Sequence, residues 1–185
     1  MPRRLFLVLL LASGFALRAR AQGPPTVVVV VRHAEKAATP ANDPPLTDAG
    51  VARAKALAAI LADADVQVVI STPLVRTRET ARPTAEAHGL MIETVPLAAT
   101  VAGHAAAVAN AVRKHGGKTV LVVGHSNTVA AIIAALGGPK MPDLCDTQYS
   151  NVFTLVLYGS SARLFRGSYG APSPDPASTC PNAMR

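Results

Sequence analysis

The sequence predicts an α/β fold: a three-layer α/β/α sandwich with a mostly parallel sheet and an antiparallel edge strand. Five consecutive valines, Val27–Val31, are typical of a central parallel strand covered on both faces. Strand-like runs then alternate with helix-like segments, which indicates βαβ units. Two strand-like runs follow each other near the end of the chain and indicate an antiparallel edge. A chain of 185 residues suits one domain with a sizeable core.

Each element has a local reason in the sequence. Thr47 is the expected cap of a helix that reaches about Ala64, with Asp48 in the first turn, where the helix dipole favours a negative charge. Arg53 is expected away from the apolar face of this helix. Gly89 is a natural end for the next helix. The expected strands cover residues 26–32, 66–70, 90–95, 119–123, 151–158 and 162–165, and the expected helices cover 48–64, 75–88, 103–115 and 129–136.

The first 21 residues have the pattern of a secretory signal peptide. Two arginines precede an apolar stretch that reaches about Leu17, and Ala19-Arg20-Ala21 is a small-x-small cleavage site. An uncleaved membrane anchor is the alternative, but the stretch is short for a span of about 20 residues. We therefore expect a bacterial periplasmic or secreted protein, cleaved near Ala21, without stable membrane insertion. The expected domain is 22–169, followed by a Pro- and Ser-rich tail, 170–185.

The positive charge does not indicate a nucleic-acid partner. The net charge is +7, but four arginines lie in the leader; without them 14 Lys and Arg stand against 11 Asp and Glu, a net of +3. No basic run with interleaved aromatic residues is present. Oligomeric state cannot be inferred from the sequence.

The two cysteines have one plausible use. Cys145 and Cys180 lie 35 residues apart, and in an oxidising compartment they could pair. Such a disulfide is worth roughly 3–4 kcal/mol on the chain-entropy estimate. The alternative is two unpaired thiols. Neither cysteine has a close partner at metal-ligand spacing, so no metal site is expected.

Polar residues end three of the expected parallel strands. Arg32-His33 follows the first, Arg76 opens the helix after the second, and Gly124-His125 follows the third. Carboxyl ends of parallel strands meet at one edge of a sheet, where ligands bind. Arginine forks match phosphate oxygens, and the start of a helix adds backbone N–H donors. The combination predicts a site for phosphate or a similar tetrahedral dianion.

These segments resemble the motifs of the histidine phosphatase superfamily, also called phosphoglycerate-mutase-like. The Arg-His-Gly/Ala-Glu hallmark is similar to Arg32–Glu35, and the Leu-Thr-x-x-Gly helix opening is similar to Leu46–Gly50. The Ser-x-x-x-x-Arg-x-x-x-Thr-Ala segment is similar to Ser71–Ala81, and the second Gly-His is Gly124-His125. The four motifs occur in order over about residues 27–157. The chain resembles the compact phosphatase branch, without the insertions of the glycolytic mutases.

The resemblance implies a two-step phosphoryl transfer without a metal or other cofactor. His33 would attack phosphorus and become phosphohistidine, and water would then release phosphate. Arg32 and Arg76 would neutralise the oxygens, and His125 would bond the same phosphate. Ser126 and Asn127 are expected to cap a helix and to be additional substrate contacts. The expected substrate is a small phosphorylated molecule or a phosphoprotein.

The family's general acid is missing from its usual place after the expected strand 90–95, where Val95–Thr100 contains no carboxylate. Three carboxylates remain as candidates: Glu35, Glu93 and Asp146. A leaving group of low pKa needs little protonation, so loss of a strong acid would narrow the substrate range. A phosphate-binding module of the same fold with weak turnover is therefore the alternative to an exported phosphatase.

Overall fold

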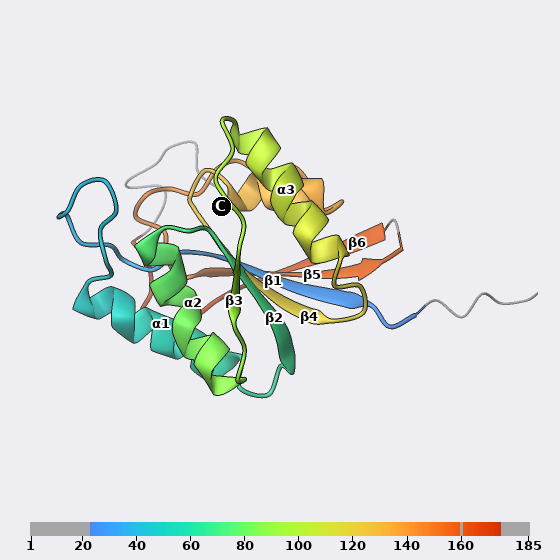
Figure 1. Cartoon of the computed structure of the whole chain (residues 1–185), viewed down its shortest axis with the longest axis horizontal. Coiled ribbons are helices and arrows are strands. Elements are labelled where there is room, and N and C mark those ends of the chain that lie inside the picture. The colour runs from blue at the N-terminus through green and yellow to red at the C-terminus, as the bar shows by residue number, and fades with distance from the viewer. Residues whose placement is uncertain (1–22, 160, 175–185) are drawn as a thin grey trace, which may run out of the picture.

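A computed structural model describes residues 23–159 and 161–174, which form a six-stranded sheet with helices on both faces (Figure 1). The elements in chain order are β1 (Thr26–Arg32), α1 (Asp48–Ile60), β2 (Val66–Ser71), α2 (Val75–Ala87), β3 (Ile92–Thr94), α3 (Val101–Arg113), β4 (Thr119–Gly124), α4 (Val129–Ala135), β5 (Asn151–Tyr158) and β6 (Ser161–Ser168).

The strand order is β3-β2-β4-β1-β5-β6. The first four strands are parallel to one another, β5 is antiparallel to β1, and β6 is antiparallel to β5. The expected fold class is therefore confirmed, with two strands at the antiparallel edge. β1 lies inside the sheet between β4 and β5, so its exit reaches the middle of one sheet edge.

The valine run builds both halves of the core. Val28 and Val30 pack in the cluster that includes α3 and α4, whereas Val29 and Val31 pack in the cluster that includes α1 and α2. Successive side chains of a strand point to opposite faces, so each helix layer receives alternate valines. Figure 1 shows α1 and α2 on one face of the sheet and α3 on the other. This double coverage explains why Val27–Val31 of β1 are all apolar.

Several element ends differ from expectation for local reasons. Helix α1 ends at Ile60, not near Ala64, because the chain tightens into turns with bonds three residues apart before Asp65, whose φ is +48°. Helix α3 begins two residues early because Thr100 caps it and accepts a hydrogen bond from the N–H of Gly103. Strand β6 reaches Ser168 because β5 pairs with it along its full length.

Arg53 is placed differently from expectation. Its side chain is buried, with 5% of the residue exposed, although it lies on a surface helix. The guanidinium pairs with Glu35, which follows β1, and donates to the backbone carbonyl of Tyr169 at 3.0 Å. The helix pattern carries no sign of these partners, because both come from other parts of the chain.

Some expectations concern residues outside the described ranges. These are the signal peptide, its cleavage near Ala21, most of the tail and Cys180. Cys145 is disulfide-bonded, and the predicted pairing with Cys180 stays a prediction. Within residues 23–159 and 161–174, no helix has the length and hydropathy that a membrane span requires.

Candidate active site

The two histidines of the motifs lie side by side where β1 and β4 end. These strands pair in parallel with Arg32 opposite Gly124, and the N–H of His33 donates to the carbonyl of Gly124 at 2.9 Å. The imidazole centroids of His33 and His125 are 5.4 Å apart with an interplanar angle of 62°. The strand register thus brings together two residues that are 92 positions apart in the sequence.

The ring of His33 is held in one tautomer. Its Nδ1 lies 2.7 Å from the carbonyl oxygen of Ala34, which can only accept a hydrogen bond, so the proton is on Nδ1. Burial lowers the pKa of His33 to about 3, helped by the positive charges of Arg32 and Arg76 and opposed by the bond to Ala34. At neutral pH the Nε2 atom therefore carries a free lone pair, which is the state a nucleophile needs.

His125 is also fixed and neutral. Its ring Nε2 lies 3.2 Å from Oγ1 of Thr72, the residue after β2. Its backbone N–H donates to Oγ1 of Thr128 at 2.8 Å. Burial, together with the positive charge of the nearby Arg76, lowers the pKa of His125 to about 4. Gly124 is required before it, because a Cβ there would lie 2.9 Å from the Thr128 hydroxyl oxygen.

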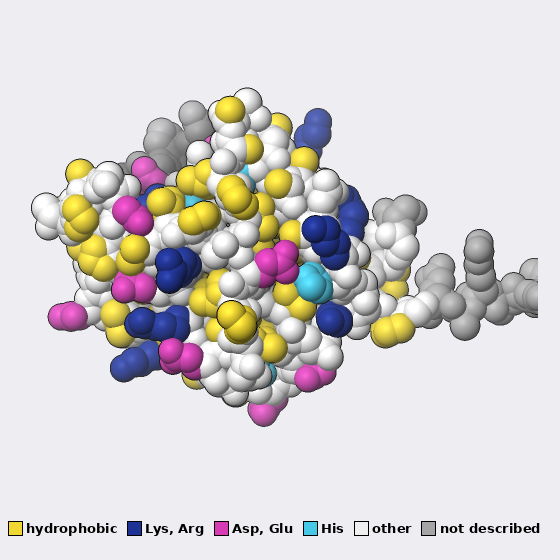
Figure 2. All heavy atoms as spheres, in the orientation of Figure 1, with side chains coloured by type: hydrophobic (Ala, Val, Ile, Leu, Met, Phe, Trp, Pro, Cys, Tyr) yellow, Lys and Arg dark blue, Asp and Glu magenta, His cyan; other side chains and the backbone are white. Residues whose placement is uncertain are grey.

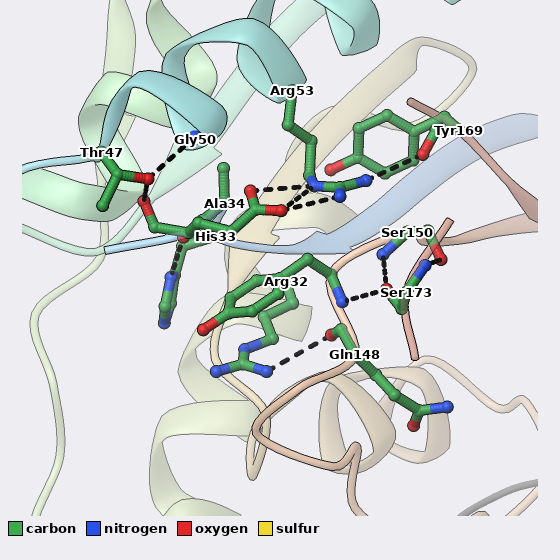
Figure 3. Close-up of polar contacts among 12 residues, drawn as sticks. Arg32, His33, Ala34, Thr47, Gly50, Arg53, Gln148, Ser150, Tyr169 and Ser173 are labelled. Atoms are coloured by element: carbon green, nitrogen blue, oxygen red, sulfur yellow. Dashed lines mark hydrogen bonds and ion pairs between the residues drawn. The ribbon is translucent and has the colours of Figure 1, made fainter. Parts of the chain in front are cut away.

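Arg32 is almost fully buried at the site, with 3% of the residue exposed. Its Nη1 donates to the carbonyl oxygens of Cys145 at 2.8 Å and Gln148 at 3.3 Å, and its guanidinium carbon lies 4.2 Å from the ring centroid of Tyr149 (Figure 3). Its buried Nε has no hydrogen-bond partner among the described residues. The loop before β5 thus orients the guanidinium and leaves one buried donor unused.

Arg76 reaches the same site from the first turn of α2. Its Nη1 lies 3.7 Å from Oδ1 of Asp43, and that carboxylate also accepts from the N–H of Val75 at 2.9 Å. The Nε of Arg76 is the second buried guanidinium donor without a partner in the described part of the chain. Two such donors are expected to bind an anion, because a buried N–H without a partner costs roughly 1–3 kcal/mol.

The other expected contact residues lie at the rim. Ser126 donates from Oγ to Oδ1 of Asp146 at 2.9 Å, and the same oxygen lies 3.4 Å from Nη2 of Arg32. The Asp146 side chain is 89% exposed. Asn127 lines a cavity of about 330 Å³ together with Arg76 and His125. The structure therefore places Ser126, Asn127 and Asp146 beside the two arginines and two histidines. The expectation that Ser126 and Asn127 cap the helix is wrong, because the N-cap of α4 is Thr128 and Ser126 bonds Asp146.

Glu35 does not offer its carboxylate to this site. Arg53 binds both carboxylate oxygens, with Nε at 2.9 Å from each and Nη2 at 2.7 Å from Oε1 (Figure 3). Burial alone would raise the pKa of Glu35, but the hydrogen bonds and charge of Arg53 outweigh it and hold the pKa below its ordinary value. Glu35 is thus ionised, and its bonds to Arg53 fix the segment after His33 against α1.

Glu93 is not brought to the site either. Its carboxylate lies 2.9 Å from Nε2 of His115, which follows α3 at the amino end of the sheet. The site lies at the opposite, carboxyl end of the parallel strands. Of the three candidate acids, only Asp146 contacts a residue of the site.

Sequence reasoning missed several supporting residues. Thr72 contacts His125, Tyr149 covers Arg32, Asp43 ties the loop after β1 to α2, and Thr80 accepts from the N–H of Ala34 at 2.9 Å. Thr80 stands in one of the motifs and could have been singled out there. Thr72 lies in the same segment, at a position that the motif leaves open, and Asp43 and Tyr149 come from loops without any local signal.

No group of three or more His, Cys, Asp or Glu side chains within the described ranges could hold a metal ion. What the arrangement offers is two guanidinium groups, two neutral imidazoles and a helix start. These groups suit phosphate recognition and nucleophilic attack on phosphorus.

Two comparisons with known sequences each match part of the chain. Residues 28–99 match the sequence model of the histidine phosphatase superfamily (branch 1). The chain is 49% identical over 51 residues to the "Uncharacterized protein Rv0525" of Mycobacterium tuberculosis, a match that covers 28% of this chain. The matched stretch spans 25% of that relative's length.

Solved structures show a similar fold over most of the chain. The protein histidine phosphatase SixA, solved in complex with tungstate, has a TM-score of 0.62 at 21% identity and covers 77% of this chain and 96% of its own. The mycobacterial glucosyl-3-phosphoglycerate phosphatase Rv2419c has a TM-score of 0.61 at 18% identity and covers 80% of this chain and 100% of its own. At these identities the similarity establishes the fold.

Proposed function

We propose that this chain, a member of the histidine phosphatase superfamily, is a phosphatase that hydrolyses a phosphomonoester through phosphohistidine on His33. The observation that carries the proposal is the state of His33. Its Nδ1 is bound to the Ala34 carbonyl, its ring is neutral at pH 7, and His125 and two arginines lie around it. A neutral imidazole with a free Nε2 is a competent nucleophile toward phosphorus.

The reaction has two balanced steps. In the first, Nε2 of His33 attacks phosphorus, the bond to the ester oxygen breaks, and that oxygen leaves with the electron pair and takes up a proton. In the second, water attacks the phosphohistidine, loses a proton, and the P–N bond breaks to return the electron pair to Nε2. Arg32 and Arg76 would bind the equatorial oxygens, and their unpartnered Nε atoms support this role.

The proton for the leaving oxygen would come from Asp146 or from water. Asp146 is the candidate carboxylate that lies beside the site, in contact with Arg32 and Ser126. Its exposure at the rim suits exchange of protons with solvent. We expect Asp146→Asn to slow hydrolysis of alkyl phosphates more than hydrolysis of p-nitrophenyl phosphate, because p-nitrophenolate leaves without protonation.

The direct test is hydrolysis of p-nitrophenyl phosphate by the wild type and by His33→Ala. The variant is expected to lose at least about a thousandfold in kcat, since the nucleophile is removed. His88→Ala is the matched control, because His88 bonds the carbonyl of Leu61 at the far end of α2. Equal rates for wild type and His33→Ala would defeat the enzyme proposal.

A phosphate-binding module with weak turnover is the second candidate. It is favoured by the wall of the cavity beside the site, where residues 97–101 contribute no carboxylate. Such a module would bind inorganic phosphate through Arg32 and Arg76 and would give no His33-dependent hydrolysis. Phosphate captured covalently on His33 would count against it.

We propose further that the protein is exported and acts without a metal ion. The disulfide at Cys145 supports an oxidising compartment, since such bonds are rare in bacterial cytosol. The two arginines support metal independence, because guanidinium groups can supply the charge that Mg²⁺ provides elsewhere. Cell fractionation with N-terminal sequencing tests export and cleavage near Ala21. If the enzyme needs no metal ion, its activity should be unchanged after dialysis against EDTA.

A further inference from the structure

A cavity of about 330 Å³ continues from the phosphate site into the space between the start of α2 and the start of α3. Arg76 and His125 line both the site and this cavity, whereas His33 does not line the cavity. A group attached to a phosphate held by Arg76 and His125 can therefore extend into this space, away from the attacking imidazole. In-line displacement puts attacking and leaving atoms on opposite sides of phosphorus, so a cavity that His33 does not line is where the leaving group would lie.

One side of this cavity is apolar, while Arg76, Thr100, His104, His125, Asn127 and Thr128 line the rest of it. Five of its side chains are Leu74, Leu97, Ala98, Ala99 and Val101. Leu97 and Val101 are 51% and 39% exposed, so two large apolar side chains stand open to solvent beside a charged site. Figure 2 shows hydrophobic side chains gathered on this face between the starts of α2 and α3. Apolar surface next to a reactive site is typical of a pocket that a ligand covers.

The cavity offers little to a charged leaving group. No Asp, Glu or Lys within the described ranges lines it, and its one arginine, Arg76, already faces the phosphate site. His104 also lines it, but its Nδ1 lies 3.1 Å from the carbonyl oxygen of Pro96, which leaves Nε2 as an acceptor that cannot bind an anion. A carboxylate placed here would lose part of its hydration without gaining a second cation. Asp146 does not line this cavity, so a proton from it would have to come from outside the wall, which favours a leaving group that departs as a stable anion, such as a phenolate.

We infer that the cavity receives an uncharged apolar leaving group, so that the preferred substrates are aryl phosphomonoesters. This inference rests on the proposed phosphatase function. The volume lies near the lower end of the roughly 300–1,000 Å³ found for ligand pockets, which suits one or two aromatic rings.

The test compares phenyl phosphate with 4-carboxyphenyl phosphate. The carboxylated phenolate is the better leaving group, so chemistry alone favours the charged ester, while the cavity favours the uncharged one. We expect kcat/KM for phenyl phosphate to be at least about tenfold higher, which is the usual scale of discrimination in an apolar pocket. Equal or greater kcat/KM for the charged ester, with both reactions dependent on His33, would overturn the inference and leave the phosphatase function intact.

Two variants give a second readout. Leu97→Asn is expected to raise KM for phenyl phosphate about tenfold while inhibition by inorganic phosphate stays unchanged, because the apolar wall contacts only the leaving group. Met91→Asn is the matched control, since Met91 is 93% exposed and lies outside the cavity. A Leu97→Asn enzyme with wild-type KM would contradict the inference. A wild type that hydrolyses neither ester faster than His33→Ala would overturn the proposed function and the inference together.

Discussion

Replacement of Arg53 by Met tests whether the buried ion pair with Glu35 holds the segment after His33. The Arg53 side chain is 4% exposed and the Glu35 side chain 24% exposed, and three N–H···O distances between them are 2.9 Å or shorter. Removing one partner of a buried pair costs about 3–5 kcal/mol, because the remaining charge is left buried without compensation. Since Glu35 keeps some contact with water, we expect a loss of about 2–3 kcal/mol in the free energy of unfolding.

Urea unfolding of the wild type, Arg53→Met, Glu35→Gln and the double variant measures this effect. The cycle is expected to give a coupling of about 1–3 kcal/mol, with the double variant more stable than the sum of the single changes predicts. Arg82→Met is the matched control, because its pair with Glu86 is 3.9 Å long and both side chains are more than half exposed. We expect that control to stay within about 0.5 kcal/mol of the wild type.

The pH dependence gives an independent check. The pKa of Glu35 is lowered in the folded protein, where the bonds from Arg53 outweigh the opposing effect of burial. The pair therefore contributes its full stability at neutral pH and loses it as the pH falls through the lowered pKa, below the ordinary value of 4.5. The gap between wild type and Arg53→Met should narrow there. An Arg53→Met protein as stable as the wild type at pH 7 would refute the reasoning.

Three further expectations concern the site. Arg76→Met should lower kcat/KM for p-nitrophenyl phosphate at least about a hundredfold, because a phosphate-binding charge is lost. Arg78→Met changes an exposed residue of the same helix and should leave kcat/KM unchanged. Equal losses in the two variants would argue against phosphate binding by Arg76. Activity should fall as the pH drops toward the pKa values of about 3 for His33 and about 4 for His125, because both imidazoles become protonated and His33 loses the lone pair that attacks phosphorus. A fall in activity centred near pH 6.5 would contradict the claim that His33 and His125 are neutral at pH 7. Gly50→Ala should destabilise the protein by about 1–3 kcal/mol in urea unfolding, because the added Cβ would collide with the carbonyl oxygen of Glu35. Gly116→Ala is the control and should be near neutral, because a Cβ there has no neighbour closer than 4.0 Å. Equal changes in the free energy of unfolding for the two variants would refute the predicted collision.

The fold was predictable from the sequence because burial leaves a pattern along the chain. The run Val27–Val31 has to be apolar on both faces of β1, and the capping hydroxyl of Thr47 sits where the first helix begins. The site was predictable for a related reason. Arg32-His33 and Gly124-His125 each follow a parallel strand directly, so the sheet itself brings them together.

Residues that act across the chain left no such pattern. Arg53 was expected on the polar part of its helix, and only the path of the segment after β1 gives it Glu35 as a partner. Asp43 and Tyr149 lie in loops, and their contacts with Arg76 and Arg32 depend on how those loops fold back. Glu93 stood near the expected position of the acid in the sequence, but its carboxylate bonds His115 at the other end of the sheet.

The most direct test of the account is to identify the residue that carries phosphate during turnover. The enzyme would be mixed with a radiolabelled aryl phosphate, quenched in base, which preserves phosphohistidine, and digested for mass spectrometry. The account predicts label on His33 in the wild type and none in His33→Ala. Rapid hydrolysis without covalent label, or label on His125 in place of His33, would contradict it.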